Sequence, residues 1–362
     1  MKKHVIASTL ALMSGAVFAQ SSQGSVSIYG EIDAGVSYIN NAGGASTTRA
    51  RSGAWDGSRW GFLGNEDLGG GYQAIFRLEN GFDAMTGNLG QNGREFGRQA
   101  YVGVGTPYGV ITFGRQYDPI VDNLGTILAN GRGSSPMFDL DNTGNDYATN
   151  NSVKFKSLNY KGLSFSTMYA FGGVAGQMGT NSAWGAGVNY SNGPLSAGAA
   201  YTSVHNPYAV WYNSTGASSI ATYGAYLPSA NALNIAAVGA AYAFGQLTVR
   251  GGMTHSVLTQ AAAGNNVQFN TYVLQGDYML RPDIRLSAAV DLTNAGIGGT
   301  GKRPKYRQYN LVADYILSKR TDVYVWLIYG TAAGSDVAQI GQLPASSTNR
   351  QLNTHIGIRH RF

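Results

Sequence analysis

Hydrophobic and polar residues alternate along much of the chain with a period of two. Between Val26 and Tyr38 the even positions are apolar or small, and the odd positions include Glu31 and Asp33. The last residues, 352–362, repeat the alternation. Successive side chains of a β-strand point to opposite faces, so this pattern predicts strands with one apolar and one polar face.

Sixteen segments follow the pattern. They lie at 25–39, 57–64, 71–82, 96–105, 108–117, 152–158, 163–171, 183–190, 194–204, 233–243, 246–256, 268–278, 284–293, 305–316, 322–329 and 352–362. The connections between them are alternately long and short. The long ones fall at 40–56, 83–95, 118–151, 172–182, 205–232, 257–267, 294–304 and 330–351. Up-and-down strands with every long loop at one end are typical of outer-membrane barrels.

The charge content supports a membrane barrel over a soluble one. Only 12% of the residues are charged, and residues 162–249 contain no Asp, Glu, Lys or Arg. A soluble domain needs surface charge, whereas a membrane barrel presents an apolar face to lipid. The predicted fold class is therefore all-β, a 16-stranded antiparallel transmembrane β-barrel. Sixteen strands enclose an aqueous channel, which predicts a diffusion pore.

The N-terminal residues have the layout of a secretory signal peptide. Lys2 and Lys3 precede a mostly apolar stretch, and Ala19 closes a small-residue cleavage site. We therefore expect residues 1–19 to be removed and residues 20–362 to form the barrel. The chain has no Cys, which excludes disulfides, thiolate nucleophiles and Cys-based metal sites.

Four motifs carry a resemblance to a known family. They are SIYGEID at 27–33, SRWGFLGNEDLG at 58–69, GRQAYVG at 97–103 and FGRQY at 113–117, with a terminal Phe362. In order and spacing the chain resembles the general trimeric porins of Gram-negative outer membranes, of the β-proteobacterial type. The resemblance implies a homotrimer with one pore per subunit. It also implies a third long loop, 118–151, folded into the lumen as a constriction, and a terminal aromatic residue read by the barrel-assembly machinery.

Charged residues around that loop are the candidate constriction site. Alternation places Arg59, Arg77, Lys154 and Lys156 on the water-facing side of their strands, whereas only the resemblance places Arg98 inside. The basic candidates are Arg59, Arg77, Arg98, Lys154, Lys156 and Arg132, and the acidic candidates on the loop are Asp118, Asp122, Asp139, Asp141 and Asp146.

Some positions depart from the family pattern or fall outside the predicted pore. Met137 and Thr149 stand where the family often has Glu and Arg, which leaves the exact constriction partners open. Arg115 shares its parity with Phe113, so we interpret it as a strand-end or subunit-contact residue.

Enzyme and nucleic-acid functions have little support in the sequence. The five His are scattered, and no Gly-x-Ser-x-Gly nucleophile motif is present. We expect no cofactor, no metal and no nucleic-acid partner. The basic run Lys302, Arg303, Lys305 and Arg307 indicates outer-loop charge near lipopolysaccharide phosphates.

The function predicted is passive passage of small hydrophilic solutes and ions across the outer membrane. The formal net charge of +6 falls to +4 when Lys2 and Lys3 leave with residues 1–19. This charge together with the inward Arg59, Arg77, Lys154 and Lys156 predicts a weak preference for anions. Two alternatives remain open: a substrate-selective channel with an aromatic ladder along the lumen, and an adhesin or structural barrel with a closed lumen.

Overall fold

The computed structural model describes residues 24–128, 139–212, 220–334 and 336–362. The predicted signal peptide at 1–19 lies outside these described residues. The strands are β1 (Ser25–Ala42), β2 (Ala45–Ser52), β3 (Arg59–Gly69), β4 (Tyr72–Gly81), β5 (Gln99–Thr106), β6 (Gly109–Gln116), β7 (Thr149–Ser157), β8 (Leu163–Ala170), β9 (Ala183–Asn192), β10 (Leu195–His205), β11 (Ala232–Phe244), β12 (Leu247–Ala262), β13 (Asn265–Arg281), β14 (Ile284–Ile297), β15 (Lys305–Ile316), β16 (Thr321–Ala332) and β17 (Arg350–Arg361).

Helical structure is confined to short segments of the connections. They are α1 (Gly90–Gly93), α2 (Pro119–Leu128), the π-helical turn η1 (Tyr208–Tyr212) and the 3-10 turn η3 (Gly224–Tyr226). No helix in the described part of the chain has the length and apolar content to cross a membrane.

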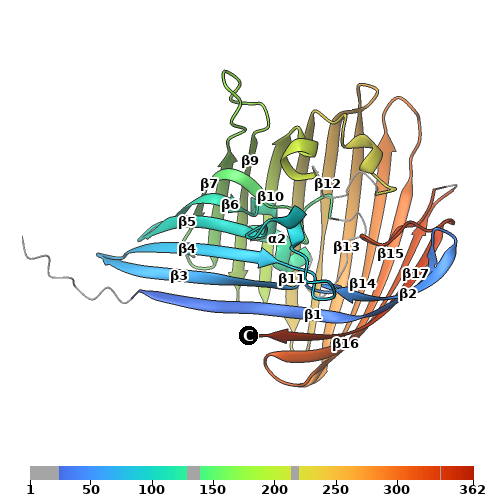
Figure 1. The fold of residues 1–362 in the computed structure, drawn as a ribbon, viewed down its shortest axis with the longest axis horizontal. Coiled ribbons are helices and arrows are strands. Elements are labelled where there is room, and N and C mark those ends of the chain that lie inside the picture. The colour runs from blue at the N-terminus through green and yellow to red at the C-terminus, as the bar shows by residue number, and fades with distance from the viewer. Residues whose placement is uncertain (1–23, 129–138, 213–219, 335) are drawn as a thin grey trace, which may run out of the picture.

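The strands close into a single antiparallel barrel (Figure 1). Apart from β2 and β3, strands that are neighbours in sequence pair with each other, and β17 pairs with β1 to complete the ring. The segments β2 and β3 pair with different parts of β1, so together they count as one strand of the barrel wall. The described residues thus form the predicted barrel of sixteen strands.

The apolar faces of the strands point outward. Ile28 and Ile356, both on the predicted apolar parity, are 67% and 61% exposed, whereas Glu31 and Asp33 on the opposite parity are buried inside. A soluble barrel would have the reverse arrangement. The exposed apolar band therefore indicates a surface that faces lipid.

Two long connections predicted from the sequence are mostly strand. Part of 40–56 forms β2, and β1 turns into it directly between Ala42 and Ala45. The region 257–267 extends β12 and β13 into a tall hairpin that turns between Ala262 and Asn265. Polar residues at these strand ends weaken the alternation, which is why the sequence pattern ends the strands too early.

Helix α2 lies inside the barrel against β9 to β11 (Figure 1). Its apolar side chains are buried at helical spacing and include Ile120, Leu124 and Leu128. The facing wall is built of small residues: a Cβ at Gly198 or Gly239 would lie within 3 Å of α2 atoms. This part of the wall therefore has lipid on one face and α2 on the other, which explains why strands β8 to β11 within the uncharged stretch 162–249 carry no charge.

Two further connections fold over the lumen. Trp211, Tyr212 and Tyr223 of the connection before β11 are buried in the same apolar cluster as α2. Ile340 and Leu343 of the last long connection pack against the inner faces of β15 and β16. The lumen is therefore narrowed by several connections, whereas the sequence predicted only one.

Candidate pore constriction

A cavity of about 950 Å³ lies inside the barrel between the wall and the connection that carries α2. The arginines that line it are Arg51, Arg59, Arg77, Arg94, Arg98 and Arg115. The acidic residues that line it are Asp56, Glu79, Asp83, Asp122, Asp139 and Asp146. The described residues thus surround this cavity with charges of both signs.

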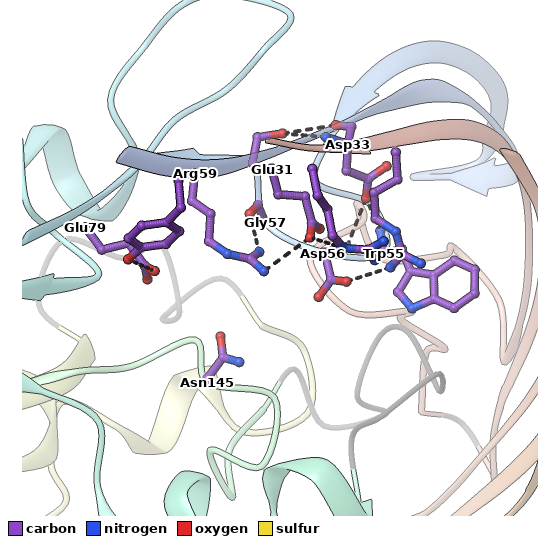
Figure 2. Close-up of polar contacts among 12 residues, drawn as sticks. Glu31, Asp33, Trp55, Asp56, Gly57, Arg59, Glu79 and Asn145 are labelled. Atoms are coloured by element: carbon purple, nitrogen blue, oxygen red, sulfur yellow. Dashed lines mark hydrogen bonds and ion pairs between the residues drawn. The ribbon is translucent and has the colours of Figure 1, made fainter. Parts of the chain in front are cut away.

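Two buried glutamates hold the basic side chains of the wall. Glu79 of β4 accepts from Arg77 Nη2 at 2.6 Å and from Arg98 Nε at 2.9 Å. Arg59 Nη2 lies 3.4 Å from Glu31 Oε2 (Figure 2). Charge-assisted hydrogen bonds of this kind fix the direction of a guanidinium group. The structure therefore brings the three predicted arginines together on one side of the cavity.

Three of the lining arginines have no carboxylate partner. Among the described residues, no ion pair involves Arg51, Arg94 or Arg115, although Arg115 donates to backbone and amide oxygens. Their positive charge is consequently not neutralised within the wall. It can act on ions in the cavity.

Arg115 lies at the end of β6, as one of the two interpretations held, but its exclusion from the pore lining is wrong, because Arg115 lines the cavity. The β6–β7 register shifts between Gly114 and Gln116, and Gly114 has φ of 140°. This bulge breaks the period of two, so parity with Phe113 no longer predicts the direction of Arg115. Its guanidinium donates to the carbonyl oxygens of Gly97 at 2.7 Å and Ala148 at 2.8 Å.

Two of the acidic candidates are buried inside the folded connection instead of facing the cavity. Asp118 caps α2 by accepting from the backbone N–H of Ile120 at 2.6 Å, and it also accepts from Thr202. Burial raises the pKa of Asp118 to about 6. Asp141 accepts from Thr254 of β12 at 2.7 Å. Both carboxylates satisfy nearby donors, which local sequence cannot reveal.

Three acidic candidates border the cavity: Asp122, Asp139 and Asp146. Asp122, in the first turn of α2, lies 2.7 Å from Lys154 Nζ. Asp139 accepts from the backbone N–H groups of Gly144 and Asp146, and its pKa is raised by burial and by Asp146.

This turn extends to the basic wall, because Asn145 Oδ1 accepts from Arg98 Nη2 at 3.1 Å. The connection and the wall are therefore linked directly at the cavity.

The remaining basic candidates lie elsewhere. Lys154 is mostly buried and donates to Asp122 and to the carbonyl oxygen of Tyr117. Lys156 is exposed on the same strand, outside the residues that line the cavity. Arg132 lies outside the described residues.

Sequence reasoning missed the carboxylates that organise the wall. Glu31 and Glu79 share strand parity with Asp33 and Arg77, so alternation alone contained the signal for both. Arg51 and Arg94 fell in segments predicted as connections, where alternation gives no direction. No group of three or more His, Asp or Glu suited to a metal ion occurs in the part of the chain that the structure describes.

The arrangement acts on charged solutes. Basic groups project from the barrel wall, and Asp122, the buried Asp139 and Asp146 of the α2 connection border the same cavity. Opposed charges across an aqueous passage orient dipolar solutes and discriminate between ions.

Comparison with known proteins gives consistent results. A family model described as Gram-negative porin matches residues 7–332. The chain is 29% identical to an outer membrane porin protein of Bordetella pertussis and 27% identical to outer membrane porin protein 32 of Delftia acidovorans, in both cases over 100% of each chain. Its fold is similar to that of an anion-selective porin from Comamonas acidovorans, with TM-score 0.77, 23% identity and coverage of 94% of this chain and 100% of that one. It is also similar to OmpT of Vibrio cholerae in its trimer form, with TM-score 0.70, 16% identity and coverage of 94% and 99%.

Proposed function

Because the chain belongs to the Gram-negative porin family of the outer membrane, we propose that it is a passive channel for small hydrophilic solutes and ions with a weak preference for anions. Proteins of this family are channels, and no catalytic step is part of the proposal.

One observation carries the ion preference. The lumen cavity is lined by Arg51, Arg94 and Arg115, which have no carboxylate partner among the described residues. Several of the lining carboxylates are already engaged: Glu79 by two arginines and Asp122 by Lys154. Asp83, Asp139 and Asp146 also line the cavity without an ion pair among the described residues, but burial raises the pKa of Asp139 and Asp146. We therefore infer a small excess of positive charge facing the water. The fold similarity to a porin described as anion-selective agrees with this reasoning.

The constriction in this proposal lies between the wall and the connection 118–151. Arg59, Arg77 and Arg98 supply its basic side, and Asp122, Asp139 and Asp146 supply its acidic side. Asp118 and Asp141 contribute indirectly by holding the connection in its fold.

The proposed assembly is a homotrimer. The similar fold of the Vibrio cholerae barrel solved in a trimer form supports it. Native mass spectrometry of the detergent-extracted protein should then give three times the mass of one chain, and a monomer mass would contradict the proposal.

Export and assembly use the two ends of the chain. We assign residues 1–19 as a cleaved signal peptide, which intact-mass measurement of the mature protein tests. Phe362 is the proposed signal for the barrel-assembly machinery. Its backbone N–H and carbonyl groups pair with Gly30 at 3.0 Å, and its exposed ring lies where a Cβ of Gly30 would be.

Lipopolysaccharide is the proposed lipid partner of the outer rim. On β15 the outward face begins with Lys305 and Arg307 and continues with the exposed residues Tyr309 and Leu311. Tyr309 stacks on Tyr329 of β16, and outward aromatic residues of this kind mark the membrane interface. The two cations consequently lie at the level of lipid phosphates and have no ion pair among the described residues.

The experiment that tests the channel proposal is electrical. Purified protein inserted into a planar bilayer should give discrete open-channel steps, and a salt gradient should give a small reversal potential of the anion-selective sign. Absence of conductance from folded, inserted protein would refute the channel, and a cation-selective reversal potential would refute the preference.

A further inference from the structure

Residues 53–58 interrupt the second strand of the barrel wall. On β1, Glu31 pairs with Arg59 at the start of β3, and Ala34 pairs with Ser52 at the end of β2. Six residues therefore lie opposite only Ile32 and Asp33, and they cannot all remain in the plane of the wall. Unpaired backbone groups cannot face lipid, so the excess must turn toward the lumen. All six residues line the cavity.

The carboxylate of Asp33 fixes this inward segment to the wall. Asp33 is fully buried, and its Oδ2 accepts from the backbone N–H groups of Trp55 at 2.7 Å and Asp56 at 2.9 Å. The hydroxyl of Tyr324 donates to Oδ1 at 2.6 Å. The carbonyl oxygen of Asp33 also accepts from Gly53 N at 2.8 Å. These bonds give the segment one defined position.

The indole of Trp55 extends the segment across the inner wall. Its ring packs edge-on against Tyr324 of β16, with a centroid distance of 4.8 Å. The guanidinium carbons of Arg359 on β17 and Arg285 on β14 lie 4.6 Å and 5.0 Å from its centroid. Cation–π contacts of this kind hold aromatic and cationic groups together. The segment therefore covers the wall from β1 to β14.

Asp56 presents the charge of the segment to the lumen. Its Oδ2 lies 2.6 Å from Arg359 Nη1, yet the Asp56 side chain remains 42% exposed, whereas that of Arg359 is only 5% exposed. Arg359 also pairs with Asp322 at 3.1 Å. Arg361, which pairs with Asp322 at 3.2 Å, is 40% exposed but does not line the cavity, so Asp56 is the member of this network that faces it. It lies in the same cavity as Asp146 of the α2 connection.

We propose that residues 53–58 form a second constriction element, in which Trp55 positions the segment and Asp56 limits the anion preference of the pore. The inference rests on the proposed channel function. It assigns a specificity role to a stretch of the wall instead of to a loop between strands. The pore then has charge-bearing elements from two separate parts of the chain.

Single-channel recording of the full-length protein tests this inference. Asp56→Asn should raise the anion-to-cation permeability ratio at least about twofold, because one negative charge leaves the cavity wall. Trp55→Ala should release the segment and change the unitary conductance, and Trp55→Phe should restore the wild-type value. Trp184→Ala is the matched control, because Trp184 is exposed on the outward face of β9 and should leave both values unchanged.

The outcomes separate the two claims. A wild-type protein that inserts but does not conduct overturns the channel proposal itself. A wild-type channel whose permeability ratio and conductance are unaffected by Asp56→Asn and Trp55→Ala overturns only the second constriction. If Trp55→Ala fails to assemble, Asp56→Asn, which preserves side-chain shape, still decides the inference.

Discussion

Glu79 is the residue at which charge selectivity can be tested most sharply. Its carboxylate is shared by Arg77 and Arg98, and it lines the cavity. Glu79→Gln keeps the shape of the side chain and removes one negative charge. Both guanidinium groups then act on passing ions without their common partner, so the channel should become more anion-selective.

The size of the shift follows from the geometry. A cavity of about 950 Å³ corresponds to a sphere of about 6 Å radius, so a unit charge on its wall changes the energy of a central monovalent ion by about 0.7 kcal/mol in water. Screening at about 0.1 M salt lowers this to about 0.4 kcal/mol. The change has opposite sign for anions and cations, so the permeability ratio should rise about fourfold.

The assay is the reversal potential of single channels in a planar bilayer under a salt gradient. Arg59→Gln should shift the ratio in the opposite direction, because it removes a lumen cation. Asp283→Asn is the matched control, since Asp283 lies in the exposed turn between β13 and β14 and pairs with Arg281. If folded Glu79→Gln channels show the wild-type ratio, Glu79 does not border the conduction path and the assignment of the cavity as the constriction is refuted.

Three further predictions concern the connection and the outer surface. Leu124→Ala should weaken docking of α2 by about 2–5 kcal/mol, because Leu124 is fully buried against the wall. Single-channel recordings of this variant should show larger or noisier currents than those of Thr126→Ala, an exposed control. Leu124→Ala currents as quiet as those of the wild type would contradict the prediction. Deletion of Phe362 should reduce the amount of trimer in cell membranes much more than it reduces the yield of refolding in detergent, with both measured by gel mobility. Equal, mild defects in the two settings would indicate that Phe362 has a packing role alone. Replacing Lys305 and Arg307 with Glu should lower the lipopolysaccharide that copurifies, measured by phosphate analysis, and an unchanged amount would argue against a phosphate site there.

The barrel could be predicted from the sequence because apolar and polar residues alternate in a membrane strand that has lipid on one face and the lumen on the other. The exposed Ile28 and Ile356 and the buried Glu31 follow the predicted parity. The uncharged stretch 162–249 was correctly interpreted as membrane-compatible. Its second cause, the cover that α2 provides inside, could not be predicted because it depends on contacts between distant segments.

The candidate site was predictable only where regular strand geometry holds. Arg77 lies within β4, and Arg59 is the first residue of β3, where the register with β4 is regular, so the inward direction of both follows from parity. Arg115 follows a bulge, and Asp118 folds back to cap a helix, so neither parity nor charge indicates its role. The inward position of residues 53–58 depends on the register of β1 with two strands, which no local pattern specifies.

The proposed function requires the lumen to be an open aqueous passage for small hydrophilic solutes. Swelling of proteoliposomes in a graded series of uncharged sugars tests it most directly. An open passage should give swelling rates that fall smoothly with sugar size and rise linearly with concentration, with no dependence on sugar identity at equal size. Saturable uptake of one sugar would instead indicate a substrate-selective channel, and no swelling with the smallest sugar would contradict the open passage.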